Sequence, residues 1–134
     1  MTRNIYIFII CLLANIAYAD NNSGIDFYKA GEPDIAKKLF EEQLNSSPAE
    51  KAVALYYIGE IAFDAGRPAE ALDYYKQGWE TNPEYAFNKV GEGKILLKTD
   101  RPAAEKAFAA AVKVNKKNAE TYVAIASAYS TNGM

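Results

Sequence analysis

GEPDIAKKLF, residues 31–40, is followed 35 residues later by GRPAEALDYY, residues 66–75, and the two stretches share one frame. The same offset relates pairs of residues inside and beyond these stretches: Gly24 and Gly59, Gly31 and Gly66, Ala36 and Ala71, Phe40 and Tyr75, and Pro48 and Pro83. Self-similarity at a fixed period of about 20–50 residues is typical of repeat architectures. The offset therefore predicts a chain built from stacked copies of one unit.

Each unit is expected to contain two helices. In the second unit an apolar stripe at i, i+3, i+4 and i+7 indicates the first helix: Leu55, Ile58, Gly59 and Ala62. Gly66 is suited to end that helix in the left-handed conformation, and Pro68 is suited to open the next one. The apolar stripe of the second helix is Leu72, Tyr75 and Trp79. Short links between such helices predict antiparallel hairpins.

The pattern continues to the end of the chain. DRPAAEKAFAAAV, residues 100–112, is a third copy, and NAETYVAIASAYSTNG, residues 118–133, begins a fourth. Gly91 fits the small position in the first helix of the third unit, where the turn is expected to be one residue longer and to lack glycine. The helices are expected over residues 22–30, 33–46, 51–65, 68–81, 84–98, 102–115 and 119–132.

These residues give the chain a pattern that resembles the tetratricopeptide repeat family. The resemblance covers residues 20–134 and implies an all-α fold, a right-handed α-solenoid of about three helix–turn–helix units plus a half unit. Small residues are expected where paired helices approach closely, and aromatic rings are expected to fill the gaps between helices. The rings assigned to this role are Phe27, Phe40, Tyr75 and Phe108.

The first nineteen residues have the layout of a secretory signal peptide. Arg3 precedes an apolar run at residues 5–13, and Ala17 and Ala19 supply the small residues before a cleavage site. We expect export to the periplasm, or secretion, and no stable membrane insertion after cleavage. An uncleaved anchor is the alternative, but spanning a bilayer needs about 20 apolar residues. Cys11 lies within the run, so the mature chain contains no cysteine.

The composition of the chain excludes most catalytic chemistry. Its 134 residues include 15 Lys and Arg, 17 Asp and Glu and no His, for a net charge of −2. Without His or mature Cys, the usual nucleophilic triads and zinc sites are excluded. The charge gives no electrostatic basis for a nucleic-acid partner. We therefore expect neither an enzyme nor a bound cofactor or metal.

The resemblance also implies a ligand groove, because in this family the first helices line a concave surface. Carried onto this sequence, the groove residues are Tyr28, Tyr56, Glu60, Phe63, Asp64, Asn88, Lys89 and Glu92, continued by Val123 and Ser127 in the last helix. Tyr56 and Glu60 stand where family members that grip a carboxylate use Lys and Asn. An aromatic and acidic face suits an extended ligand with basic or polar groups. The alternative for Tyr56 and Phe63 is partial burial between units.

Three functions remain compatible with these patterns. The first is a non-catalytic scaffold for a protein or peptide, and the second is an accessory domain of a larger envelope enzyme. The third is a module that binds carbohydrate or another envelope polymer. Residues 122–133 read as a first helix without its partner, which predicts truncation within a longer repeat array. The alternative is a terminal helix that exposes Ser127, Ser130 and Thr131 to water.

Overall fold

The computed structural model of the chain describes residues 21–134. These residues form helices and no strands, as the repeat pattern predicts. The α-helices are α2 (Asn21–Lys29), α3 (Pro33–Glu42), α4 (Pro48–Asp64), α5 (Pro68–Thr81), α6 (Phe87–Leu96), α7 (Arg101–Val114) and α8 (Ala119–Thr131), and a 3₁₀ turn, η1 (Gln43–Asn45), follows α3. The expected signal peptide and its cleavage site after Ala19 lie outside the described residues.

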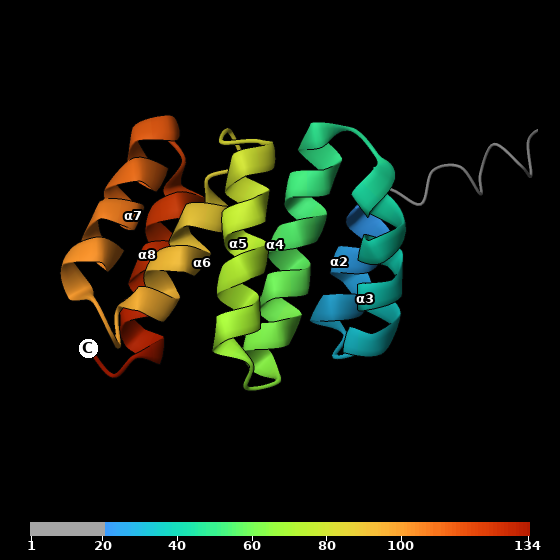
Figure 1. Cartoon of the computed structure of the whole chain (residues 1–134), viewed down its shortest axis with the longest axis horizontal. Coiled ribbons are helices and arrows are strands. Elements are labelled where there is room, and N and C mark those ends of the chain that lie inside the picture. Colours follow the sequence, from blue (N-terminus) through green and yellow to red (C-terminus); the bar gives the residue numbers. More distant parts are fainter. Residues whose placement is uncertain (1–20) are drawn as a thin grey trace, which may run out of the picture.

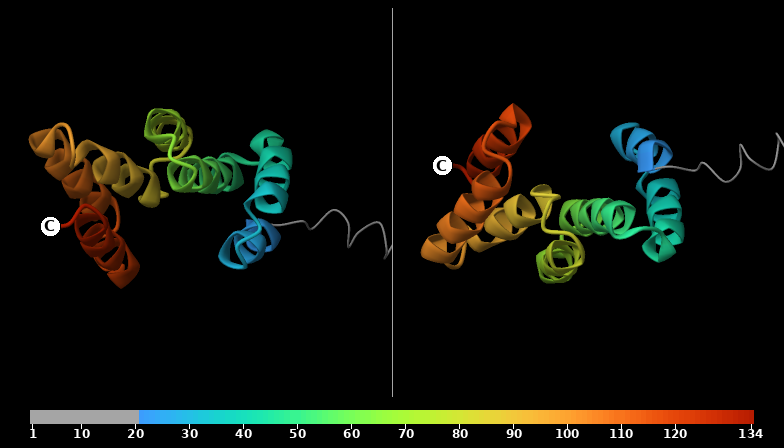
Figure 2. Two further views of the ribbon diagram at one scale, coloured as in Figure 1. Left: turned by 90° about the horizontal axis from the view of Figure 1, so that it is seen from below. Right: turned by 90° about the horizontal axis from the view of Figure 1, so that it is seen from above.

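The helices stack in sequence order as an all-α solenoid. α2 pairs with α3, α4 with α5 and α6 with α7, and α8 packs on α6 and α7 (Figure 1). Seen along the helices, α4 and α6 form the floor of a concave side, with α2 and α8 at its two ends (Figure 2). α5 lies on the opposite, outer side. The first helix of each pair therefore faces the concave side.

Glycine, proline and a capping box set the helix boundaries. Gly66 has a φ angle of 77°, so the predicted left-handed end of its helix is confirmed, and Gly31 has the same conformation with a φ of 79°. α4 begins at Pro48, three residues before the expected start at residue 51. The Ser47 hydroxyl accepts a hydrogen bond from the Glu50 N–H at 3.3 Å, and the Ser47 N–H donates to the Glu50 carboxylate at 3.2 Å. This reciprocal pairing satisfies the first donors of the helix.

The core repeats a single contact between a glycine and an aromatic ring. A Cβ added to each glycine would meet a ring carbon of its partner at 2.7 Å for Gly24 and Phe40, 2.6 Å for Gly59 and Tyr75, and 2.4 Å for Gly93 and Phe108. The predicted gap-filling role is therefore confirmed for Phe40, Tyr75 and Phe108. It is wrong for Phe27, which is 39% exposed on α2.

The third unit has a different register from the expected one. Gly93, and not Gly91, is the counterpart of Gly59, because Gly93 packs against the aromatic ring of its own hairpin. Gly91 instead packs against Tyr75 of the preceding unit. Gly59 and Tyr75 are 16 positions apart, whereas Gly93 and Phe108 are 15 apart. The interval from the glycine to its ring is therefore one residue shorter than in the second unit. The link between the helices, residues 97–100, is one residue longer than residues 65–67 of the second unit, as expected.

The start of α6 and the turn after it explain this difference. The Asn82 side chain accepts a hydrogen bond from the Glu84 N–H at 3.1 Å, and the resulting turn delays α6 until Phe87. After α6 the Asp100 N–H donates to the Leu96 carbonyl at 2.7 Å, and Leu97 stays right-handed with φ −52°. This turn needs no left-handed residue, so it forms without glycine.

The last helix has one buried face and one exposed face. Ile125 and Tyr129 pack against the core between α6 and α7, and Ala128 is buried there. α6 and α7 therefore cover part of this helix. Tyr122 and Val123 are 47% and 68% exposed.

Candidate functional site

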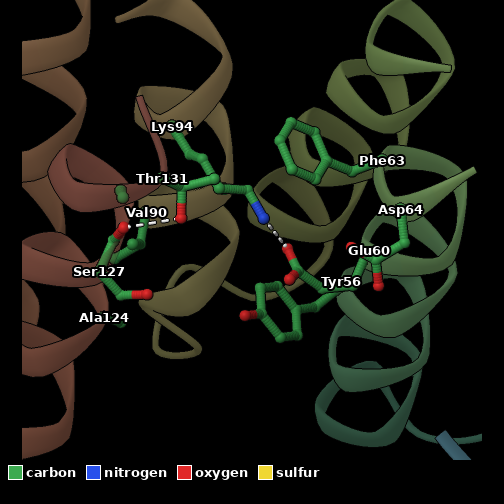
Figure 3. Close-up of a pocket in the computed structure, with 11 residues that line it drawn as sticks. Tyr56, Glu60, Phe63, Asp64, Val90, Lys94, Ala124, Ser127 and Thr131 are labelled. Carbon is green, nitrogen blue, oxygen red and sulfur yellow. Dashed lines mark hydrogen bonds and ion pairs between the residues drawn. The ribbon is translucent and has the colours of Figure 1, made fainter. Parts of the chain in front are cut away.

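A pocket of about 210 Å³ opens on the concave side between α4, α6 and α8 (Figure 3). We call this pocket the groove. Its lining residues are Tyr56, Glu60, Phe63, Asp64, Val90, Gly91, Lys94, Ala124, Ser127, Ala128 and Thr131. The structure thus brings together four of the residues predicted on α4, which are Tyr56, Glu60, Phe63 and Asp64, with Ser127 of α8 across from them. Tyr56 and Phe63 are also partly buried between units.

An ion pair crosses the groove from α4 to α6. Lys94 Nζ lies 2.6 Å from Glu60 Oε1, and the two side chains are only 13% and 14% exposed. The Tyr75 hydroxyl donates to the same carboxylate oxygen. Lys94 Nζ also lies 4.1 Å from the centre of the Phe63 ring, within the range of a cation–π contact. The cation of Lys94 is therefore held by Glu60 and Phe63 within the groove.

Lys94 was not expected in the groove, although the sequence carries a signal for it. Glu60 and Lys94 are 34 positions apart, which is one repeat. Each comes directly after the glycine that packs against the aromatic ring of the same hairpin, which is Gly59 for Glu60 and Gly93 for Lys94. Residues at equivalent positions of adjacent first helices lie side by side in such a stack. The pairing was hidden because the third unit was aligned on Gly91.

The same misalignment explains why the remaining α6 predictions fall elsewhere. Asn88 is fully buried, its Nδ2 donates to the Ala52 carbonyl at 3.0 Å, and its inclusion in the groove was wrong. Lys89 and Glu92 pair with each other at 2.6 Å and line a separate depression beside α7. Two positions along an α-helix correspond to a rotation of about 200°. The register error of two residues therefore placed the expected groove on the wrong face of α6.

Tyr28 lies next to the groove and belongs to a second pocket. Its hydroxyl donates to Asp64 Oδ2 at 2.8 Å, which connects α2 to α4. Tyr28 and Asp64 both line this second pocket of about 430 Å³. Asp64 therefore links the two hollows, and its charge faces both.

A third hollow, of about 260 Å³, shares Tyr56 with the groove. Its lining consists of four aromatic rings and one carboxylate: Tyr56, Tyr57, Tyr85, Phe87 and Glu120. The ring centroids of Tyr57, Tyr85 and Phe87 lie 5.1, 5.7 and 5.8 Å from that of Tyr56. We call these five residues the aromatic cage. None except Tyr56 was expected from the sequence.

Burial makes several tyrosines of the concave side difficult to ionise. Removal from water raises the pKa of Tyr28, Tyr75 and Tyr85 well above the ordinary value, and the negative charge of Glu60 adds to this effect. The pKa of Tyr56 is raised by the same two causes. These phenols therefore remain neutral hydrogen-bond donors over the physiological pH range.

Folding stability is expected to fall as the pH rises above about 10. An unfolded chain ionises its tyrosines near pH 10, whereas the folded chain resists ionisation at Tyr28, Tyr56, Tyr75 and Tyr85. A pKa raised on folding contributes stability that is present below the unfolded pKa and lost above it. Tyrosinate absorbance and helical circular dichroism should change together, with the urea-unfolded chain as the control. Full tyrosine ionisation with intact helices would contradict this prediction.

Two features are absent from residues 21–134. No group of three or more acidic, His or Cys side chains in this range is placed to hold a metal ion. No helix in the same range combines the length and apolarity needed to cross a membrane.

Antiparallel helix pairs, stacked so that their first helices line a concave groove, define an α-solenoid of helical-hairpin repeats. Residues 21–85 of the chain match the model of the tetratricopeptide repeat family. One solved structure with a similar fold is the first tetratricopeptide repeat domain of Spaghetti (RPAP3), bound to the HSP90 peptide SRMEEVD. It matches with a TM-score of 0.65 and 15% identity, over 85% of this chain and 93% of the other. A search of the curated proteins found no match.

Proposed function

We propose that the chain is an exported, non-catalytic scaffold that binds an extended segment of a protein or peptide along the groove. The supporting observation is the arrangement of Tyr56, Phe63 and Asp64, which offer two rings and one carboxylate on the same side of α4. The related fold of Spaghetti, solved with a peptide bound, supports a peptide as the occupant. Aromatic rings bind extended peptides with little loss of side-chain entropy.

The charges of the groove favour basic or polar side chains in the ligand. Glu60 neutralises Lys94, the only cation among the groove residues, so the negative charge of Asp64 remains. The Tyr28 hydroxyl donates to Asp64 without neutralising it. We therefore propose a ligand that places a basic group close to Asp64.

Selection of a random peptide library on residues 20–134 tests this function. Enrichment of peptides with Lys or Arg is expected, and Asp64→Asn should weaken their binding by roughly threefold to tenfold, since it removes one exposed charge. Asp73→Asn, an exposed change on α5, is the matched control and should bind normally. Failure to select any peptide, or equal loss in both variants, would overturn the proposal.

The location of the protein needs a separate measurement. We propose that it resides in the periplasm after removal of residues 1–19, because those residues have the layout of a signal peptide. Fractionation of a tagged chain should recover it in the periplasmic fraction with Asp20 at its N-terminus. Recovery of the uncleaved chain in the cytoplasm would contradict this.

The acidic peptide SRMEEVD is expected not to bind measurably to this chain, although it is bound in the structure of Spaghetti. The peptide carries three acidic side chains, and the groove offers them one cation that Glu60 already neutralises. Titration calorimetry should therefore show no binding heat. Binding as tight as that of the selected basic peptides would contradict the charge argument.

A further inference from the structure

Aromatic side chains from two helices and a turn line the aromatic cage. Tyr56 and Tyr57 come from α4, Tyr85 from the turn before α6 and Phe87 from the first residue of α6. The faces of aromatic rings carry negative partial charge and attract cations that lie within about 6 Å of the ring centre. Four rings around one hollow can therefore hold a positively charged group from several sides.

Neighbouring rings hold the cage in place. Tyr57 stacks on Phe40 with ring centroids 5.0 Å apart and planes within 4°. Tyr85 and Phe87 contact each other at 5.3 Å, in addition to their contacts with Tyr56. Because the rings are already ordered, a ligand does not bear the entropy cost of assembling them.

Glu120 gives the cage a negative charge that no cation in the described part of the chain neutralises. It lies in the first turn of α8 and is exposed, and the ion pairs formed among residues 21–134 do not include it. Its charge adds to the raised pKa of Tyr57 and Tyr85, after burial and the charge of Glu60. An unneutralised carboxylate beside ring faces is complementary to a cation and unfavourable for an anion.

The groove extends this charge complementarity along the concave side. Together the groove and the cage are lined by three carboxylates, Glu60, Asp64 and Glu120, and by one cation, Lys94. Since Lys94 neutralises Glu60, two carboxylates remain for a ligand, one in each hollow. Tyr56 lines both hollows, so a single extended segment can occupy them in succession.

We propose that the aromatic cage binds a basic side chain of the partner segment, with arginine preferred. The planar guanidinium group stacks on aromatic rings and pairs with a carboxylate in fixed geometry, which suits it to these rings and Glu120. The inference rests on the proposed function, which supplies a peptide segment as the occupant. It adds that the cage selects a basic side chain of that segment. Asp64 would favour a second basic group further along the same segment.

Small probes test the cage independently of any peptide. N-acetyl-arginine amide should produce saturable NMR shifts in the ring signals of the cage. N-acetyl-citrulline amide, which has nearly the same shape and no charge, should bind at least roughly tenfold more weakly. Equal binding of the two probes, or shifts that do not saturate, would overturn the inference.

Two pairs of variants locate the probe. Glu120→Gln should weaken binding of the arginine probe severalfold, whereas Glu80→Gln, a change of another exposed glutamate on α5, should not. Phe87→Leu should weaken it further, with Phe27→Leu, a change of an exposed ring on α2, as its control. Circular dichroism verifies folding, and Glu120→Gln remains decisive if Phe87→Leu does not fold, because Glu120 is exposed. If both Glu120→Gln and a folded Phe87→Leu bind the arginine probe as tightly as the wild type, the cage is excluded as the site.

The failure of this inference differs from the failure of the proposed function. If selected peptides bind through Asp64 but tolerate Glu120→Gln and lose no affinity when their arginines become citrulline, the cage inference is overturned and the scaffold function stands. If the arginine probe saturates the cage but no peptide is selected, the cation site stands and a peptide as its occupant is overturned.

Discussion

Gly59→Ala is expected to lower the free energy of unfolding by about 1–3 kcal/mol through overpacking of the core. Gly59 lies inside α4, where alanine has the higher helix propensity by about 1 kcal/mol, so propensity alone predicts stabilisation. The steric term should prevail because an added Cβ would lie 2.6 Å from Cε1 of Tyr75. Urea denaturation followed by circular dichroism measures the difference.

The Tyr75 ring has little room to move away from such a methyl group. It is fully buried, and Gly91 of α6 confines it from a second helix, since a Cβ there would also lie 2.6 Å from its Cε1. Its hydroxyl donates to Glu60, which fixes the far end of the ring. Gly59→Leu should therefore cost more than Gly59→Ala, by forcing α4 and α5 apart.

Gly66→Ala is the matched control, because it adds the same methyl group in open space. No atom lies within 4 Å of the added Cβ, but the residue has a φ of 77°. The expected loss of about 1–2 kcal/mol is then backbone strain alone. Gly66→Asn should recover part of it, whereas Gly59→Asn should not. A Gly59→Ala protein as stable as the wild type would contradict the packing argument.

The sequence allowed accurate prediction of the fold where glycine and proline mark the turns. The first two units carry such marks at Gly31, Pro33, Gly66 and Pro68, and their hairpins were placed correctly. The third unit has glycines at both residues 91 and 93, and its turn lacks a left-handed residue. Either glycine fits the family pattern, and only packing distinguishes the one that faces Phe108 from the one that faces Tyr75.

Groove residues could be predicted correctly only in units whose alignment with the repeat was correct. The groove residues on α4 follow from the well-marked second unit, whereas those on α6 were displaced by two positions to another face. The aromatic cage depends on a different kind of information. Tyr85 lies in a turn and Glu120 in the first turn of α8, and the curvature of the stack, which brings them together, is not encoded in any local spacing.

Lys94→Met and Glu60→Gln should each lower the free energy of unfolding by about 1–3 kcal/mol, because each leaves a largely buried charge without its partner. The two side chains are only 13% and 14% exposed, so water replaces the lost partner poorly. The double variant should lose less than the sum of the two single losses, which a double-mutant cycle in urea measures. Additive losses would show that the pair contributes no coupling energy.

The same substitutions should change ligand choice in opposite directions. Glu60→Gln releases Lys94 from its counter-charge and removes one carboxylate, so SRMEEVD should gain measurable affinity while basic peptides lose it. Lys94→Met should strengthen the binding of basic peptides, since Glu60 then adds its charge to that of Asp64, and should leave SRMEEVD without measurable affinity. The control is the Lys89 and Glu92 pair, which has the same 2.6 Å separation but lies outside the groove. Lys89→Met and Glu92→Gln should leave both peptide affinities unchanged, and a parallel shift in these variants would mean that net charge, and not the groove, determines binding.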